Sequence, residues 1–173
     1  EKNNVLLIGK AGVGKTALVE KLAYKINHKE VPKLLQNKVI YELSLSSIVA
    51  GTKYRGEFEE KFKKIIDKVI QAKDAILFID EIHNLIGAGG AEGAIDASNI
   101  LKPFLARKDL TLIGATTIEE YYKYFEKDQA MNRRFSILKI NENTKEETKD
   151  ILLGLKQQYE NYHHIDIPDE RID

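Results

Sequence analysis

The sequence predicts an α/β fold in which a five-stranded parallel sheet carries helices on both faces. Five short apolar runs have the length and composition of buried strands. Helical patterns separate most of these runs, and a strand that returns parallel to its predecessor needs such a crossover. The 173 residues suit one domain, and the 43% hydrophobic content is enough for a core.

The first strand and the first helix are predicted on either side of a glycine-rich turn. Residues 5–8 are apolar and form the strand, and residues 16–27 place apolar side chains at helical spacing. The β-branched and aromatic residues 39–43 predict the second strand.

A loop, a helix and the third strand are expected next. Residues 51–56 form a loop bounded by glycines, and its Tyr54 belongs to no neighbouring apolar pattern. Residues 57–71 carry apolar side chains at i, i+3 and i+4 with charged residues between them, so they predict an amphipathic helix. Residues 75–79 are apolar throughout, as in a strand buried on both faces.

The remaining elements complete the alternation. Residues 87–93 are rich in glycine and predict a loop, which is followed by a helix over residues 94–105. The fourth and fifth strands are expected over residues 110–114 and 136–140, and a last helix over about 146–159.

The turn after the first strand, Gly-Lys-Ala-Gly-Val-Gly-Lys-Thr, matches the phosphate-binding P-loop pattern in its required context. Its glycines let successive N–H groups point at a phosphate chain, and the helix adds the positive end of its dipole. Lys15 is expected to reach the β- and γ-phosphates, and the Thr16 hydroxyl to bind Mg²⁺. A glycine-rich turn that binds nothing is the alternative. The predicted nucleotide-binding residues of the loop are Gly9, Lys10, Ala11, Gly12, Val13, Gly14, Lys15 and Thr16.

The third strand runs directly into Asp80 and Glu81, which together form a Walker B pattern. Asp80 is predicted to bind the nucleotide's Mg²⁺ through water, and Glu81 to polarise the water that attacks the γ-phosphate. Alone, a strand that ends in Asp-Glu is more often an ordinary strand exit. The P-loop strengthens the prediction because both motifs follow parallel strands and therefore meet at one edge of the sheet.

Three further residues are predicted to act on the γ-phosphate. Thr117 follows the fourth strand and is expected to hydrogen-bond the attacking water, with a threonine that caps the next helix as the alternative. Arg133 and Arg134 precede the fifth strand, and arginines supplied across a subunit boundary can neutralise transition-state charge. Solvated arginines are the alternative.

The composition argues against several function classes. Basic and acidic residues number 27 each, so the net charge indicates neither a nucleic-acid nor a membrane surface. No apolar run approaches the roughly 18 to 20 residues of a membrane span, and no signal-peptide pattern opens the chain. Cysteine is absent, which leaves no disulfide framework and no thiolate metal site. His83, His163 and His164 lack metal-ligand spacing and are interpreted as structural or solvated.

Together these motifs resemble the first AAA+ module of Clp protein unfoldases of the ClpB and ClpC type. The resemblance covers nearly the whole chain and implies the three-layer fold of an AAA+ P-loop NTPase. It implies that residues 1–173 are the large α/β subdomain, and that the small helical subdomain, an N-terminal domain and a second ATPase module lie outside the chain. The matching stretches are residues 9–16, 50–58, 77–83, 87–103, 114–117 and 133–135.

The resemblance also implies a function, which is the ATP-driven unfolding and threading of unfolded or aggregated polypeptides through a homo-hexameric ring. It implies ATP and Mg²⁺ as cofactors, Thr117 as the first sensor, and Arg133 and Arg134 as the arginines that reach a neighbour's nucleotide. An aromatic side chain can grip a polypeptide without reading its sequence, and flanking glycines allow movement. The residues that match the family's substrate-gripping pore loop are Lys53, Tyr54, Arg55 and Gly56, and residues 87–93 match a second loop at the pore.

Several alternatives stay open. The unfoldase could disaggregate proteins, feed a ClpP-type peptidase or drive proteins through a translocon, in the cytoplasm, an endosymbiotic organelle or a secretory compartment. The sequence departs from the family at Lys10-Ala11 and at Asn132, where Glu-Pro and Glu are usual.

Two other functions are alternatives to a protein unfoldase. The first is an AAA+ motor on nucleic acid, such as a clamp loader or helicase, and the second is a nucleotide-gated scaffold. Alone, the chain is expected to hydrolyse little ATP.

Overall fold

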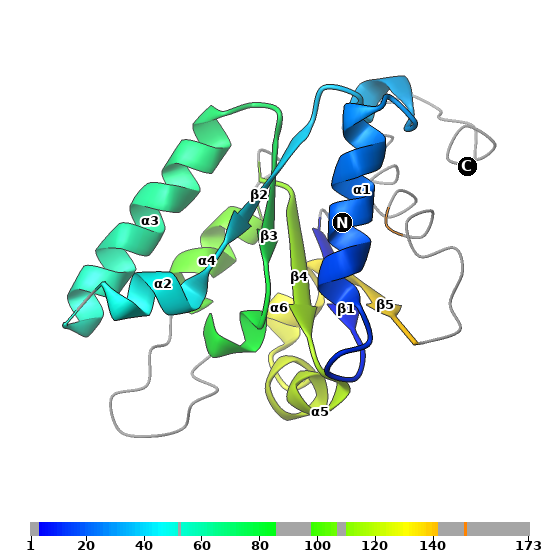
Figure 1. Cartoon of the computed structure of the whole chain (residues 1–173). Helices are drawn as coiled ribbons and strands as arrows, with labels where there is room; N and C mark the ends of the chain where they lie inside the picture. The colour runs from blue at the N-terminus through cyan, green and yellow to red at the C-terminus, as the bar shows by residue number, and fades with distance from the viewer. Residues whose placement is uncertain (1–3, 52, 86–97, 107–109, 142–150, 152–173) are drawn as a thin grey trace.

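Five parallel strands form one sheet with the order β2-β3-β4-β1-β5 (Figure 1). The computed structural model describes residues 4–51, 53–85, 98–106, 110–141 and 151. The five strands and their parallel pairing confirm the sheet that the sequence predicts. Its strands are β1 (Asn4–Ile8), β2 (Val39–Leu43), β3 (Ala75–Ile79), β4 (Leu112–Thr116) and β5 (Phe135–Lys139).

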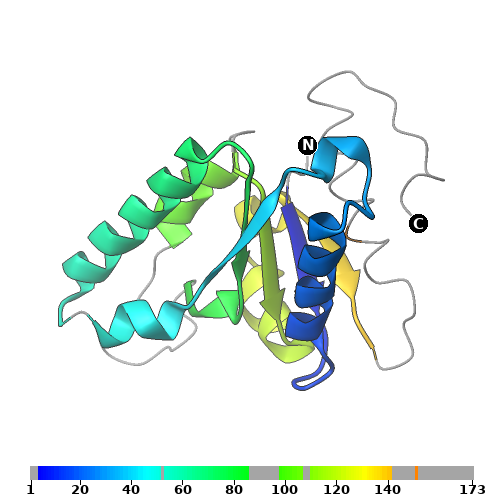
Figure 2. The same cartoon turned by 45° about the horizontal axis from the view of Figure 1, so that its top comes forward.

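Helices cover both faces of the sheet, as Figures 1 and 2 show for α1 (Lys15–Asn27) on one side and α3 (Arg55–Gln71) with α4 (Ser98–Leu105) on the other. Successive side chains of a strand point to opposite faces, so each inner strand contributes to two cores. Shorter elements connect these layers. They are η1 (Lys33–Leu35), α2 (Leu45–Ala50), η2 (Ile82–Leu85), α5 (Ile118–Glu120), the π-helical turn η3 (Tyr121–Phe125) and α6 (Gln129–Asn132).

The two cores divide β1 between them. Leu6 and Ile8 pack in the cluster that contains the buried phenylalanines of α3. Val5 and Leu7 pack in the cluster that contains the buried residues of α1. This division gives the expected arrangement of three layers, a sheet between two layers of helices. The apolar side chains of β1 are fully buried on both faces of the sheet.

The predicted fourth strand is wrong by two residues, because β4 spans Leu112–Thr116. The chain continues through Gly114, where a Cβ atom would lie 2.9 Å from Cδ1 of Ile82. Glycine in a strand can thus mark a close approach of a neighbour rather than the strand's end. The fifth strand begins one residue earlier than predicted, at Phe135, which is fully buried.

The predicted loop over residues 51–56 is wrong at its end, because α3 already begins at Arg55. The short helix α2 before it has no sequence prediction. Its N-cap is Ser44, whose side chain accepts a hydrogen bond from the backbone N–H of Ser47. The helix predicted over 94–105 is described from Ser98 onward. Of the predicted last helix, only Ile151 lies within the described residues, where it is helical and buried.

Candidate active site

The P-loop connects β1 to α1 at the carboxyl edge of the sheet (Figure 1, dark blue). Gly12 and Gly14 have φ angles of +79° and +100°, a left-handed region that glycine adopts without steric cost. Gly14 is the N-cap of α1, and no side chain among the described residues makes a cap hydrogen bond there. The first N–H groups of α1 therefore face the loop without a side-chain partner and suit an anion.

Lys15 lies across this loop, with its residue only 9% exposed. Its Nζ donates to the carbonyl oxygen of Gly9 at 2.8 Å and to that of Lys10 at 3.1 Å. Burial lowers the pKa of Lys15, while the negative charge of Asp80 raises it. The ammonium group is thus held at the centre of the loop, where phosphates would bind.

Thr16 and Asp80 bring the P-loop and the Walker B pattern into contact. The Thr16 hydroxyl donates to Oδ2 of Asp80 at 3.2 Å, and the other carboxylate oxygen of Asp80 accepts from the backbone N–H of Glu81 at 2.8 Å. The described residues contain no cluster of three or more metal-ligating His, Cys, Asp or Glu side chains. A hydroxyl beside one carboxylate nevertheless fits Mg²⁺, which keeps several waters and takes other ligands from phosphates.

Glu81 turns the chain sharply at the end of β3. Its φ of +50° lies in the left-handed region, which is uncommon for a residue other than glycine. Its carboxylate accepts a long hydrogen bond of 3.4 Å from Nδ2 of Asn84, on the 3₁₀ turn that follows. The side chain is exposed and lies at the edge of the cleft, where an attacking water could reach it.

Most of the residues predicted to bind and hydrolyse the nucleotide line one cleft of about 310 Å³. Lys10 and Val13 line a neighbouring hollow instead. The cleft joins the P-loop, the end of β3 and the end of β4. Its lining residues are Ala11, Gly12, Gly14, Lys15, Thr16, Asp80, Glu81, His83, Thr116 and Thr117.

Thr117 lies in this cleft, but its hydroxyl accepts a hydrogen bond from the backbone N–H of Glu120 at 3.1 Å. It therefore caps α5, which is the alternative that the sequence leaves open, and its role as a sensor stays a prediction. The preceding Thr116 is buried, and its hydroxyl lies 2.8 Å from Nδ1 of His83.

His83 is the site residue that sequence reasoning misses. It lines the cleft, and its partial burial and its contact with Thr116 agree with the structural interpretation. Burial lowers the pKa of His83, whereas nearby Glu120, Glu81 and Asp80 raise it. The sequence feature that could have indicated this position is the spacing of three residues between Asp80 and His83, which lies in the 3₁₀ turn η2 directly after β3.

Arg133 and Arg134 lie away from this cleft, at the opposite edge of the sheet. Phe135, which follows them, pairs with Asn4 at the start of β1, and Nδ2 of Asn4 donates to the carbonyl oxygen of Arg134 at 3.3 Å. The P-loop follows the other end of β1, a strand length of about 16 Å away. The structure therefore does not bring the arginines together with the P-loop of their own chain.

Tyr54 lies at the start of α3, and 70% of the residue is exposed. The backbone around it is held from α3, because Glu57 accepts from the N–H of Lys53 at 3.1 Å and Lys61 donates to the carbonyl oxygen of Gly51 at 3.0 Å. The loop predicted at residues 87–93 lies outside the described residues. Tyr54 thus presents a large aromatic side chain to solvent beside the first turn of α3.

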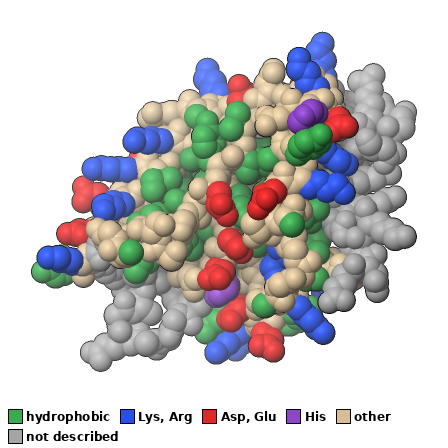
Figure 3. Space-filling view, in the orientation of Figure 1, with side chains coloured by type: hydrophobic (Ala, Val, Ile, Leu, Met, Phe, Trp, Pro, Cys, Tyr) green, Lys and Arg blue, Asp and Glu red, His purple; other side chains and the backbone are tan. Residues whose placement is uncertain are grey.

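The surface shows no single basic face in the orientation of Figure 3. Acidic side chains gather near the middle of the described part of that face, and lysines and arginines lie mainly toward its rim. None of the described helices is both long and apolar enough to cross a membrane.

Comparisons with known proteins agree with this fold. The family described as "ATPase family associated with various cellular activities (AAA)" matches residues 5–154. Chaperone protein ClpB of Oceanobacillus iheyensis is 58% identical over 172 residues, and the Bacillus subtilis protein "Negative regulator of genetic competence ClpC/MecB" is 55% identical over 172. Each alignment covers 99% of this chain and 21% of the relative.

A solved structure has a similar fold. It is a closed-state reconstruction of Hsp104 with ATPyS and FITC casein, which matches with a TM-score of 0.70 and 44% identity over 96% of this chain and 28% of the other. The chain thus spans about a fifth of the length of the curated relatives. From its fold, its cleft and the match over residues 5–154, we conclude that the chain belongs to the AAA family of ATPases.

Proposed function

We propose that this chain is the ATP-hydrolysing large subdomain of a Clp-type ring that unfolds polypeptides and threads them through its central pore. The observation that carries the proposal is the convergence of Lys15, Asp80 and Glu81 on one cleft, in a chain that also exposes Tyr54 on α3. A small helical subdomain, an N-terminal domain and a second ATPase module belong to other parts of such a protein.

The residues of the cleft support ATP, bound together with Mg²⁺, as the proposed substrate. Lys15 would contact the β- and γ-phosphates, while Thr16 and Asp80 would hold the ion directly and through water. Mg²⁺ would supply charge neutralisation between these phosphates.

A second hollow of about 370 Å³ flanks the P-loop and is lined partly by Val13, Ile118 and Ile140. Its apolar walls suit the flat face of a nucleotide base.

The positions of Arg133 and Arg134 support the proposal that the protein assembles into a ring. Within one chain they lie a strand length from the nucleotide cleft, so they could serve it only from a neighbouring copy. Arginines that enter from a neighbour neutralise charge in the phosphoryl-transfer transition state. Thr117 is proposed as the sensor that contacts the attacking water from within the chain. A homo-hexamer in which each chain completes the next site meets these requirements.

Tyr54 supports an unfolded or aggregated polypeptide as the substrate. An exposed aromatic ring makes favourable contacts with backbone and side chains of any sequence. The similar Hsp104 structure contains FITC casein, a polypeptide. We propose that Lys53, Tyr54, Arg55 and Gly56 form the gripping loop. A ClpP-type peptidase and a translocon remain the candidate partners of the ring.

Substrate stimulation of ATP turnover distinguishes this function from that of a nucleic-acid motor. In the whole assembled protein, an unfolded polypeptide such as casein is expected to raise ATP turnover several-fold, and single-stranded DNA of equal mass concentration is expected to have no effect. The measurement is steady-state phosphate release at saturating ATP. Stimulation by DNA alone would instead favour the clamp-loader or helicase alternative.

A further inference from the structure

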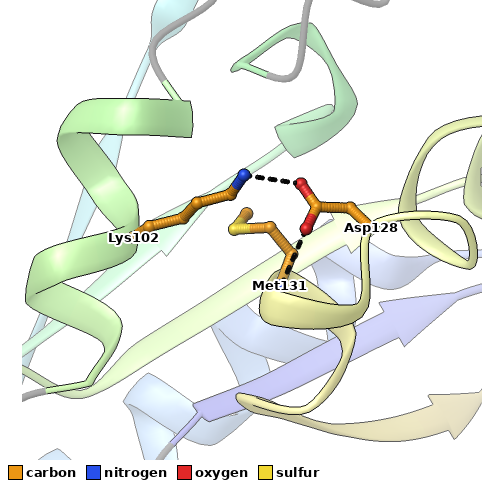
Figure 4. A network of polar contacts seen from close by, with 3 residues as sticks. All are labelled: Lys102, Asp128 and Met131. Atoms are coloured by element: carbon orange, nitrogen blue, oxygen red, sulfur yellow. Dashed lines mark hydrogen bonds and ion pairs between the residues drawn. The ribbon is translucent and has the colours of Figure 1, made fainter.

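The turn that carries Arg133 and Arg134 is fixed at its start by Asp128. One carboxylate oxygen of Asp128 accepts from the backbone N–H of Met131 at 3.2 Å and so caps α6. The other lies 2.9 Å from Nζ of Lys102 on α4, as Figure 4 shows. Met131 itself is fully buried. The base of the turn is therefore attached to the core and to a neighbouring helix.

The end of the same turn is held by Tyr121. Its hydroxyl donates to Oδ1 of Asn132, the residue directly before Arg133, at 2.8 Å. Tyr121 is only 8% exposed, and its ring stacks on Phe125 with centroids 6.3 Å apart. Burial, helped by Glu126 and Tyr122, raises the pKa of Tyr121, so the hydroxyl keeps its proton and can donate at neutral pH.

Tyr121 is also attached to the nucleotide cleft. Its backbone N–H donates to the carbonyl oxygen of Thr117 at 2.9 Å, and Thr117 lines the cleft and caps the helical turn that leads to Tyr121. Two consecutive hydrogen bonds, both made by Tyr121, therefore join Thr117, which follows β4, to the residue before the arginines. A displacement of the cleft edge at Thr117 would move Tyr121, and through it Asn132.

We propose that Tyr121 is a positioning residue, which through its hydrogen bond to Asn132 orients Arg133 and Arg134 according to the state of its own chain's nucleotide cleft. The inference rests on the proposed action of these arginines at a neighbour's site. Tyr121 touches no nucleotide in this scheme. Its effect should therefore appear in the rate of hydrolysis and not in the affinity for ATP.

Tyr121→Phe tests this inference in the whole assembled protein, with any second ATPase module inactivated. The substitution removes one hydroxyl and keeps the buried ring. Loss of a single hydrogen bond of this kind predicts a kcat about 3- to 10-fold below wild type, with an unchanged KM for ATP. Tyr122→Phe is the matched control, because it removes a hydroxyl from the adjacent, exposed tyrosine, and it should keep the wild-type kcat.

Variants of the partner residue sharpen the test. Asn132→Leu should lower kcat as much as Tyr121→Phe does, and the double variant should lose no more than either single variant. Asn132→Asp keeps an acceptor oxygen in place and should retain most of the wild-type kcat. A wild-type kcat in Tyr121→Phe, or additive losses in the double variant, would overturn the inference.

The arginines give the reference that separates the two proposals. If Arg133→Ala and Arg134→Ala both retain wild-type turnover, their proposed action at a neighbouring site fails, and the inference fails with it. If either variant loses turnover but Tyr121→Phe does not, only the positioning role of Tyr121 is refuted.

Discussion

Replacing Glu81 with glutamine is expected to lower ATP hydrolysis by about 100- to 10,000-fold while ATP binding persists, because a positioned general base contributes about that much. Glutamine keeps the shape of the side chain and removes the carboxylate that would polarise the attacking water. The substitution leaves Lys15, Thr16 and Asp80, the proposed nucleotide-binding residues, unchanged. The measurement is single-turnover hydrolysis together with ATP affinity, in the whole assembled protein with any second ATPase module inactivated.

Glu119→Gln is the matched control for Glu81→Gln. Glu119 is an exposed carboxylate on α5, near the same edge of the sheet. Its replacement should change hydrolysis by less than about twofold, as expected for a surface substitution. Unchanged hydrolysis in Glu81→Gln would contradict the assignment of the general base. It would also favour the nucleotide-gated scaffold, which needs no such carboxylate.

Replacing Lys15 with methionine is expected to weaken ATP binding by about 10- to 100-fold, because a hydrogen bond to a charged group contributes about 1.5 to 3 kcal/mol. Lys15 is held within the P-loop by the carbonyl oxygens of Gly9 and Lys10. In the complex its ammonium group would exchange these neutral acceptors for phosphate oxygens, which form stronger charge-assisted hydrogen bonds. Equilibrium binding of ATP measures the loss.

The loop supplies its own control in Lys10, which is exposed, whereas Lys15 is buried. Lys10→Met removes the same charge from the same loop but keeps the backbone N–H through which Lys10 would contact the nucleotide. It should weaken ATP binding by less than about threefold, since exposed charges are screened by water and salt. Equal losses in the two variants would show that general charge attraction, and not a directed contact of Lys15, binds the phosphates.

The P-loop and the Walker B pattern could be predicted from the sequence because their structure is local. Gly12 and Gly14 supply the left-handed backbone that the turn needs, and Lys15 follows them at a fixed spacing. A buried parallel strand that ends in Asp80 must deliver that residue to the carboxyl edge of the sheet. Both motifs therefore meet once the fold class is known.

Contacts between distant residues were beyond prediction from one sequence. His83 reaches Thr116 across 33 positions, and Tyr121 reaches Asn132 only because a π-helical turn and a capped helix bring them together. The extent of β4 also escaped the apolar pattern, since Gly114 and Ala115 are small residues within a buried strand. Tertiary packing sets these features, and the local sequence does not contain them.

In the proposed function, ATP hydrolysis drives a polypeptide past Tyr54. The most direct measurement compares wild type and Tyr54→Ala in the whole assembled protein, with ATP turnover and the unfolding of a folded, tagged reporter followed together. Tyr24→Ala is the control, because Tyr24 is another exposed tyrosine, 57% accessible, on α1. We expect Tyr54→Ala to lose unfolding while its ATP turnover and both activities of Tyr24→Ala persist. Unfolding at the wild-type rate in Tyr54→Ala would show that Tyr54 does not grip the polypeptide.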